Sequence, residues 1–218
     1  MFRHDLIELP SLKRIDGEVR YYELPTGERY PSATSVISAM SDDSFLDAWR
    51  ARIGYENAER ITKTSSVRGS AVHDMCERFV LNRVIDYNTE MPFNVMMFKQ
   101  LREQLITNVN DIRISEGMLY SHKLKVAGSV DLVASWKGKP AIIDFKTSIK
   151  DKKRSWIDGY FIQVTMYAMM LYEMTGIFCN DIVILMCVEQ SNRPQVFVDK
   201  AVNWMTNVVN LCKQYHKI

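Results

Sequence analysis

Residues 141–147 read "AIIDFKT", an apolar segment that carries an acid and a base two residues apart. Successive side chains of a β-strand point to opposite faces, so Ile142, Asp144 and Lys146 share one face. The other face is expected to pack against the core and holds Ala141, Ile143, Phe145 and Thr147. Asp144 and Lys146 either form a surface ion pair, which contributes at most about 1 kcal/mol, or belong to a functional site.

The composition is that of an ordinary globular protein. The chain has 218 residues, 47% hydrophobic and 25% charged, and its net charge of +2 does not by itself indicate a polyanionic partner. The cations are concentrated in residues 146–154, "KTSIKDKKR", where five of them stand against Asp151: Lys146, Lys150, Lys152, Lys153 and Arg154. Such a run is either a solvated loop or a nucleic-acid contact.

The cysteines and the apolar segments exclude several classes of protein. No C-x-x-C spacing occurs, which argues against a zinc ribbon, a cysteine-ligated cluster or a disulfide framework. The four cysteines are expected in the core of a protein from a reducing compartment: Cys76, Cys179, Cys187 and Cys212. No apolar run reaches about 18 residues, so no membrane span is expected. The first ten residues show neither a secretory nor a transit pattern, so a cytoplasmic protein of bacterial or phage origin is expected.

The first 110 residues are expected to be mostly helical. Residues 19–32, "VRYYELPTGERYPS", predict a hairpin with a glycine-containing turn. The Ser/Thr cluster that follows predicts a short helix capped at Ser32 or Thr34. Amphipathic patterns predict three further helices, over residues 44–64, 66–82 and 92–109.

Near Asp111 the pattern changes to alternating apolar and polar residues. Three successive strands are predicted up to residue 147, the last two joined by the turn "KGKP" at 137–140. A helix that ends at Gly176, two more strands and a final amphipathic helix complete the chain. The expected class is α/β or α+β, with a mixed central sheet flanked by helices. We expect one domain over residues 1–218, with a hairpin and helices in 1–110 and a sheet core in 111–218.

Two aspartates on neighbouring strands predict a metal site. Asp131 interrupts the apolar strand "VAGSVDLVAS", and a buried carboxylate needs a hydrogen-bond network or a cation. Asp144 follows on the next strand, so the two carboxylates can converge on one divalent ion. Oxygen ligands with open positions suit Mg²⁺ or Mn²⁺. Lys146 would orient an attacking water, or stabilise the negative charge that develops on a phosphate.

A predicted helix contributes His73 and Glu77, which lie four residues apart and share one helix face. A single helical histidine is often structural, but His73 could also join the two aspartates around Mg²⁺ or Mn²⁺. No H-E-x-x-H pattern supports a zinc site. Gly69, one turn earlier, costs about 1 kcal/mol inside a helix and predicts the close approach of another backbone.

A stripe of mainly aromatic residues follows the basic segment, with Trp156, Tyr160, Gln163 and Tyr167 at helical spacing. Such a stripe is either part of the core or a nucleic-acid surface. Aromatic rings beside cations are typical of grooves that bind a single strand, because the rings stack on bases while the cations meet phosphates.

Taken in order, these residues resemble the PD-(D/E)XK nuclease superfamily. The motifs are R-G-x-x-x-H at Arg68–His73, G-x-x-D at Gly128–Asp131, D-x-K at Asp144–Lys146 and Q-x-x-x-Y at Gln163–Tyr167. Within the superfamily the chain looks most like the RecB-like branch, especially the mitochondrial genome maintenance exonuclease type. The resemblance extends from about Tyr30 to the end of the Gln163–Tyr167 helix.

The resemblance implies a restriction-endonuclease-like core and roles for individual residues. The metal ligands would be His73, Asp131, Asp144 and the Phe145 carbonyl, with Glu116 ligating through water or orienting a ligand, and Lys146 would be the catalytic lysine. Gln163 and Tyr167 would position DNA or Lys146, and an N-terminal Ser/Thr motif would contact phosphate. The complete set of expected DNA contacts is Ser32, Thr34, Arg68, Lys150, Lys152, Lys153, Arg154, Trp156, Tyr160, Gln163 and Tyr167. The cysteine cluster of some relatives is missing, so no iron–sulfur cluster is expected.

The expected function is therefore a Mg²⁺- or Mn²⁺-dependent deoxyribonuclease, an exonuclease that acts on single-stranded DNA ends in replication, recombination or repair. By resemblance, the helices before Glu116 would form an arch that guides a strand. Two alternatives are a structure-selective or double-strand-specific endonuclease on the same core, and a non-catalytic nucleic-acid-binding protein. The presence of Lys146 beside a metal carboxylate argues against the second alternative.

Overall fold

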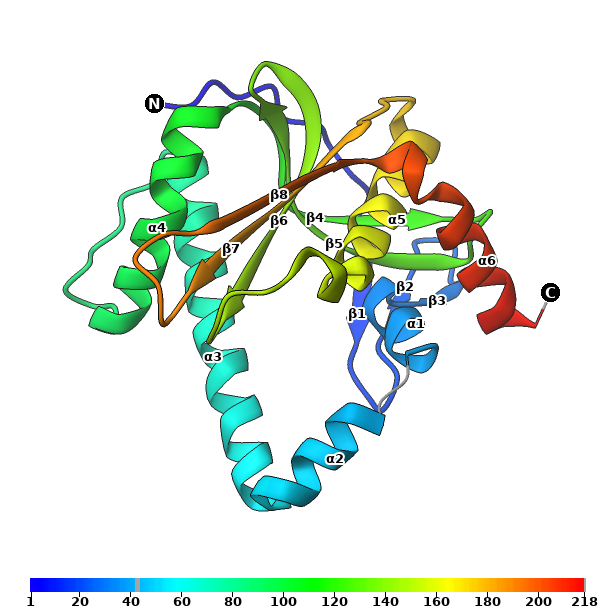
Figure 1. The fold of residues 1–218 in the computed structure, drawn as a ribbon. Coiled ribbons are helices and arrows are strands. Elements are labelled where there is room, and N and C mark those ends of the chain that lie inside the picture. Colours follow the sequence, from blue (N-terminus) through cyan, green and yellow to red (C-terminus); the bar gives the residue numbers. More distant parts are fainter. Residues whose placement is uncertain (42–43, 218) are drawn as a thin grey trace.

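The computed structural model describes residues 1–41 and 44–217. Its centre is a five-stranded sheet in the order β4-β5-β6-β7-β8, in which β6 and β7 are parallel and the other neighbours antiparallel (Figure 1). The strands are β4 (Val109–Ser121), β5 (Val126–Trp136), β6 (Lys139–Ser148), β7 (Asp181–Val188) and β8 (Gln195–Lys200). The predicted mixed α/β class and mixed central sheet are confirmed.

The β5–β6 hairpin forms where the sequence predicts it. Trp136 pairs with Lys139 across the turn residues Lys137 and Gly138. These two residues have φ angles of 49° and 79°. Positive φ at both central positions is the pattern of turns that match the twist of a hairpin. This short connection fixes the register that brings Asp131 and Asp144 to neighbouring positions.

Helices cover both faces of the central sheet (Figure 1). On one face α3 (Tyr55–Val80) and α4 (Pro92–Asn108) pack in one cluster with Ile143 and Phe145 of β6. On the other face α1 (Ala33–Ala39), α5 (Asp158–Thr175) and α6 (Met205–His216) pack around Ile142. The sequence predicted a core face only for the side of Ile143 and Phe145. The opposite side is also buried, because the parallel crossover from β6 to β7 runs through α5 and lays it on that face.

A small antiparallel sheet lies beside β5 and consists of β1 (Lys13–Ile15), β2 (Tyr21–Glu23) and β3 (Arg29–Pro31). The β2–β3 pair is the predicted hairpin, and Gly27 in its turn has a φ of 88°. Strand β1 was not predicted, because three residues are too few to show an alternating pattern. The small sheet packs on the central sheet through a cluster that includes Tyr22, Tyr30 and Ala127.

The first residues of the chain run along β4. The N–H groups of Asp5 and Ile7 donate to the carbonyls of Ile112 and Arg113, both at 2.9 Å. An edge strand with unpaired backbone groups can pair with other chains. The N-terminal segment therefore covers part of the β4 edge.

The predicted boundary between the second and third helices is wrong. Helix α2 (Ser44–Ile53) ends before Gly54, and α3 then runs without a break through the Ser/Thr cluster that suggested a boundary. Gly54 has a φ of 85°, a conformation that favours glycine. The Thr64 hydroxyl donates to the Arg60 carbonyl one turn back at 2.9 Å, so it bonds within the helix instead of ending it.

Helices α2 and α3 join elements on opposite faces of the sheet. Ala33 and Val36 of α1 belong to one core cluster, whereas Val72 and Met75 of α3 belong to the other. Between these, α2 and the first half of α3 project from the sheet, and most of their described side chains are exposed (Figure 1). The two helices therefore stand at one end of the central sheet.

The four cysteines are free and buried, as predicted for core residues: Cys76, Cys179, Cys187 and Cys212. Burial raises the pKa of the Cys187 thiol to about 12, which keeps it in the unreactive thiol form. Within residues 1–41 and 44–217, no helix has both the length and the apolar character needed to cross a membrane.

Candidate metal centre

The ladder between β5 and β6 ends at the two predicted aspartates. Leu132 and Ile143 are the last paired residues, so Asp131 and Asp144 occupy the next position in register, beyond the ladder. There Asp131 Oδ2 accepts a hydrogen bond from the Phe145 backbone N–H at 2.7 Å. A carboxylate thus satisfies a buried backbone donor where strand pairing stops. The hydrogen bond also fixes Asp131 against β6.

Asp131 shares its surroundings with His73 of α3 and Glu116 of β4. His73 Nδ1 lies 3.5 Å from Asp131 Oδ1 and 3.8 Å from Glu116 Oε1. One ligand atom from each of the three residues lies within 4.8 Å of the other two. Glu116 has a φ of 52°, a strained conformation for a residue with a side chain, and such conformations cluster at functional sites. The structure therefore brings the three predicted residues together.

A cleft of about 440 Å³ opens at this group. It is lined by α3 and β4: Gly69, Ser70, His73, Asp74, Glu77 and Glu116. Burial, and then Glu116, raise the pKa of the Glu77 carboxyl. Asp74 and Glu77 were not among the predicted site residues. The signal for Glu77 was the helix face that it shares with His73, four residues earlier.

Asp144 and Lys146 form a buried ion pair beside this cleft. Asp144 Oδ2 lies 2.5 Å from Lys146 Nζ, and the Asp144 side chain is only 1% exposed. Asp144 Oδ1 has no hydrogen-bond partner in the described part of the chain. Lys146 Nζ also lies 5.2 Å from the centre of the Tyr160 ring. Burial therefore rules out the surface ion pair that the sequence had left open.

The site contains strongly interacting charges. Burial alone would lower the pKa of His73, but the Asp131 carboxylate and then Glu116 outweigh it and raise the pKa to about 10. Burial would raise the pKa of Asp131, but His73, then Lys146 and the Phe145 N–H, hold it below its ordinary value. Without a bound metal ion, His73 and Asp131 therefore form an imidazolium–carboxylate pair at neutral pH.

Asp144 and Lys146 are shifted in a different way. Burial raises the pKa of Asp144 to about 6, since the attraction of Lys146 only partly offsets it and Asp131 adds repulsion. Burial would lower the pKa of Lys146, but Asp144 and Asp131 outweigh it and raise the pKa. Lys146 is therefore an ammonium ion, and Asp144 takes up a proton at a higher pH than an exposed aspartate does.

The donor set fits a divalent cation. Imidazole nitrogen and carboxylate oxygen from His73, Glu116 and Asp131 suit Mn²⁺ or Mg²⁺. Asp144 has a buried oxygen without a partner, which an added cation would satisfy. The arrangement differs in detail from the predicted ligand set. Glu116 stands within the converging group, Asp144 stands beside it, and the Phe145 N–H donates to Asp131.

Gln163 and Tyr167 both lie on α5, which packs against the central sheet. Gln163 Nε2 donates to Tyr167 Oη at 3.0 Å. A Cβ at Gly128 would lie 2.7 Å from Tyr167 Cε1, so the glycine of the G-x-x-D motif makes room for the ring. Tyr167 is 3% exposed. It therefore supports β5 three residues before Asp131, and its buried ring is not on the surface where a DNA contact was predicted.

Arg154, in the short helix η1 (Arg154–Trp156), is occupied by contacts within the protein. Its Nη1 donates to Asp158 at 2.8 Å and its Nη2 to Asp199 at 2.9 Å. The guanidinium also lies 3.9 Å from the centre of the Phe161 ring. This predicted DNA contact therefore ties β8 to the start of α5.

The rest of the basic segment is more accessible. The Gln195 side chain holds the Lys152 backbone, accepting from its N–H at 2.8 Å and donating to its carbonyl at 3.0 Å. Lys153 Nζ lies 5.3 Å from the ring of Trp156, which is 62% exposed. Lys150 is exposed as well. Cations and a ring thus stand on the surface near Tyr160 and Lys146.

Three further predicted DNA contacts have partners within the protein. Arg68 forms an ion pair with Glu189, and both side chains are mostly buried. Ser32 is the N-cap of α1, where its Oγ accepts from the Ser35 N–H at 3.0 Å and lies 2.9 Å from Thr34 Oγ1. The Gly69 prediction is wrong: a Cβ there would meet no backbone, only Thr147 Oγ1 at 3.7 Å.

Of the comparisons with known proteins, the one with solved structures finds a similarity. No protein-family model matches the chain, and no curated protein sequence matches it. A solved structure described as "Crystal structure of SSO0001" is similar, with a TM-score of 0.43 and 14% identity over 85% of this chain and 74% of that one. A similarity at this level indicates neither the family nor the function of the chain.

Proposed function

We propose that this protein is a Mg²⁺- or Mn²⁺-dependent deoxyribonuclease that hydrolyses phosphodiester bonds at the ends of single-stranded DNA. One observation carries the proposal. His73, Glu116 and Asp131 converge within 4.8 Å of one another, directly beside the buried Asp144–Lys146 ion pair. A purely structural cluster has no need for an unpartnered buried carboxylate oxygen and a lysine next to it.

The residues have separate roles in this proposal. His73, Glu116 and Asp131 would hold the ion, with Asp144 completing the negative charge around it. A bound divalent ion supplies a Lewis acid for the phosphate and lowers the pKa of an attacking water. The Lys146 ammonium faces the same region, where it stabilises the negative charge that develops on the phosphate oxygens. Tyr167 packs against Gly128 and so holds β5 in position.

Preference for a free DNA end rests on α2 and α3. These helices stand at the end of the sheet where β5 and β6 separate, and they link elements packed on its two faces. A strand that reaches the cleft beside α3 would have to pass along them. A closed circle of DNA would then be a poor substrate.

A panel of substrates tests the proposal. Purified protein is incubated with Mn²⁺ or Mg²⁺ and single-stranded DNA that is linear, end-blocked or circular, together with a linear duplex. We expect metal-dependent cleavage of the linear single strand, inhibition by an end block, and loss of cleavage in Asp131→Asn. Equal cleavage of linear and circular single strands would favour an endonuclease. Binding without cleavage under any metal condition would leave only a non-catalytic nucleic-acid-binding protein.

A further inference from the structure

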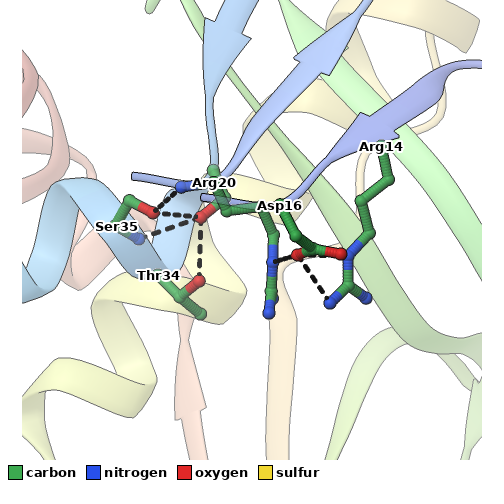
Figure 2. Close-up of polar contacts among 6 residues, drawn as sticks. Arg14, Asp16, Arg20, Thr34 and Ser35 are labelled. Carbon is green, nitrogen blue, oxygen red and sulfur yellow. Dashed lines mark hydrogen bonds and ion pairs between the residues drawn. The ribbon is translucent and has the colours of Figure 1, made fainter. Parts of the chain in front are cut away.

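Two arginines on the small sheet share a single carboxylate. Arg14 of β1 and Arg20, just before β2, each donate through Nε to Asp16 Oδ1 at 2.9 Å. Figure 2 shows the three side chains side by side, with the two guanidinium groups on either side of the Asp16 carboxylate. Their side chains are 45% and 39% exposed, respectively. The group therefore carries one net positive charge at the surface.

The backbone of Arg20 is fixed to the segment that starts α1. Its N–H donates to Ser35 Oγ at 3.2 Å, and its carbonyl accepts from the Ser32 N–H at 2.8 Å. Ser32 in turn forms a β-bridge with Ala127 of β5. Arg20 is thus connected to the strand that carries Asp131 by a short chain of backbone contacts. Asp131 lies four positions after Ala127, a span of about 13 Å along a strand.

The face of the small sheet that carries Arg14 turns toward the candidate metal centre. Arg14 pairs in register with Tyr22, and cross-strand partners share one face. Tyr22 is buried in the cluster that packs on Ala127 and on Met118 of β4. Met118 lies two residues after Glu116, on the same strand. Arg14 and Arg20 therefore stand on the side of the fold that leads to the cleft.

The chemistry of the group fits a phosphate. Asp16 engages the Nε of each arginine and one Nη of Arg14. The other Nη groups have no partner in residues 1–41 and 44–217. A guanidinium presents its donors as a planar fork that matches phosphate oxygens. Hydrogen bonds from Arg14 and then Arg20 hold the pKa of Asp16 below its ordinary value, so its carboxylate keeps both guanidiniums in place at neutral pH.

We propose that Arg14 and Arg20, held in position by Asp16, bind a backbone phosphate of the nucleic-acid strand that enters the candidate metal centre. This inference rests on the proposed function, because that function supplies the strand. It adds a phosphate-binding group outside the motifs and outside the basic segment 146–154. A strand held at both places would be fixed at two points along its backbone.

The competing explanation is that the ion pairs of Asp16 with Arg14 and Arg20 only stabilise the turn between β1 and β2. The small sheet offers a matched control in Arg29, which donates to Glu23 at 2.7 Å and is 62% exposed. Arg29 is a surface arginine on the same sheet, paired one to one with a carboxylate. If these ion pairs were only structural, removing them would change the stability of the protein alone. Removing a phosphate-binding group would change the binding of DNA and its dependence on salt.

The test measures binding of a fluorescein-labelled single-stranded oligonucleotide by fluorescence anisotropy in EDTA, where no cleavage takes place. Wild type, Arg14→Gln/Arg20→Gln and Arg29→Gln are titrated at several salt concentrations. We expect the double variant to bind about tenfold more weakly, with a salt slope reduced by about 0.7 for each phosphate that the protein no longer neutralises. Arg29→Gln should bind as wild type does. Circular dichroism checks folding, and if the double variant does not fold, the single variants are measured and should each bind several-fold more weakly.

A second readout separates this inference from the proposed function. Hydrolysis of bis(p-nitrophenyl) phosphate in Mn²⁺ uses a small diester that does not reach Arg14 or Arg20. It should be unchanged in the arginine variant and lost in Asp131→Asn. Unchanged binding and salt slope in the folded arginine variants, or no binding by wild type, would overturn the inference. Weakened binding in a protein that hydrolyses neither DNA nor the small diester would support the inference and contradict only the proposed function.

Discussion

Two clusters of charged residues in this molecule look alike in sequence and differ in structure. At Arg154 the charges are paired: Asp158 and Asp199 accept its hydrogen bonds, and Phe161 covers one face of the guanidinium. At the candidate metal centre, Asp144 keeps an oxygen without a hydrogen-bond partner in the described residues. The pKa of the neighbouring His73 is raised to about 10, mainly because Asp131 outweighs the effect of burial.

The difference teaches how to separate structural charges from functional ones. The Arg154 cluster is complete, so nothing more is needed to stabilise it. The centre at Asp131 and Asp144 is incomplete, because two acids are held together in a buried place where one of them is only partly balanced. Natural proteins retain such an arrangement where it serves a site.

The largest effect should appear in cleavage of single-stranded DNA. Lys146→Met removes the ammonium group but keeps most of the side-chain volume, so we expect the cleavage rate to fall by about 100-fold or more. Arg154→Met should leave the rate unchanged, because that guanidinium is occupied by Asp158 and Asp199. Rates are measured with an end-labelled oligonucleotide in Mn²⁺. An equal decrease in both variants would erase the distinction between the clusters.

The metal-free protein should lose stability in alkaline solution because of His73. Its pKa is raised to about 10 in the folded state, against an ordinary value of 6.5. The stabilisation is therefore fully present below pH 6.5 and is lost as the pH rises through about 10. We expect it to amount to a few kcal/mol, since one pKa unit corresponds to about 1.4 kcal/mol. Melting curves in EDTA should fall with pH for wild type and much less for His73→Gln; parallel curves would contradict the assignment.

How far the sequence predicted this site depends on how far apart the interacting residues are. The β5–β6 hairpin follows from a local turn, so the proximity of Asp131 and Asp144 could be predicted. The break at Gly54 could not be predicted, because the Ser/Thr cluster also suggested a helix boundary. In the structure that cluster lies inside α3, where the Thr64 hydroxyl donates to a carbonyl of the same helix.

Partners far along the chain were also beyond prediction. Glu189 forms an ion pair with Arg68 although the two residues lie 121 positions apart in the sequence. Asp199 occupies Arg154 from β8 in the same way. Both arginines stand in motifs or basic runs that indicate nucleic-acid contacts, and only the tertiary structure shows which charges are already paired.

The ionised carboxylate of Asp144 should destabilise the folded protein at neutral pH. Its pKa is raised to about 6 by burial, against an ordinary value of 3.8, so the folded state prefers the protonated acid. Stability is then lost as the pH rises from about 4 to about 6. Asp144→Asn imitates the protonated form and should melt roughly 5 °C higher than wild type at pH 7, with no difference at pH 4. Scanning calorimetry checks this.

Asp199→Asn is the matched control for that measurement. Burial would raise the pKa of Asp199, but hydrogen bonds from Trp204, Lys200, Asn203 and Arg154 outweigh it and lower the pKa. The charged form is therefore the one that the fold prefers, and the asparagine variant should melt lower than wild type. A lower melting temperature for Asp144→Asn as well would mean that Asp144 is a structural charge.

The smallest effect concerns the stability of the Arg154 cluster. Arg154 is 41% exposed, so solvent screens its ion pairs. Arg154→Met should reduce the free energy of unfolding by about 1 kcal/mol, from the ion pairs and the packing on Phe161 together. Urea denaturation measures this change. A decrease several times larger would mean that this cluster is essential to the fold.

The central claim is that His73, Glu116 and Asp131, with Asp144 beside them, bind a divalent ion. Electron paramagnetic resonance of free Mn²⁺ tests it directly, because bound ions leave the free signal. The account predicts saturable binding by wild type, affinity reduced by about tenfold or more in Asp131→Asn, and unchanged binding in Asp199→Asn. No uptake of Mn²⁺ by the wild-type protein, or equal uptake by Asp131→Asn, would contradict it.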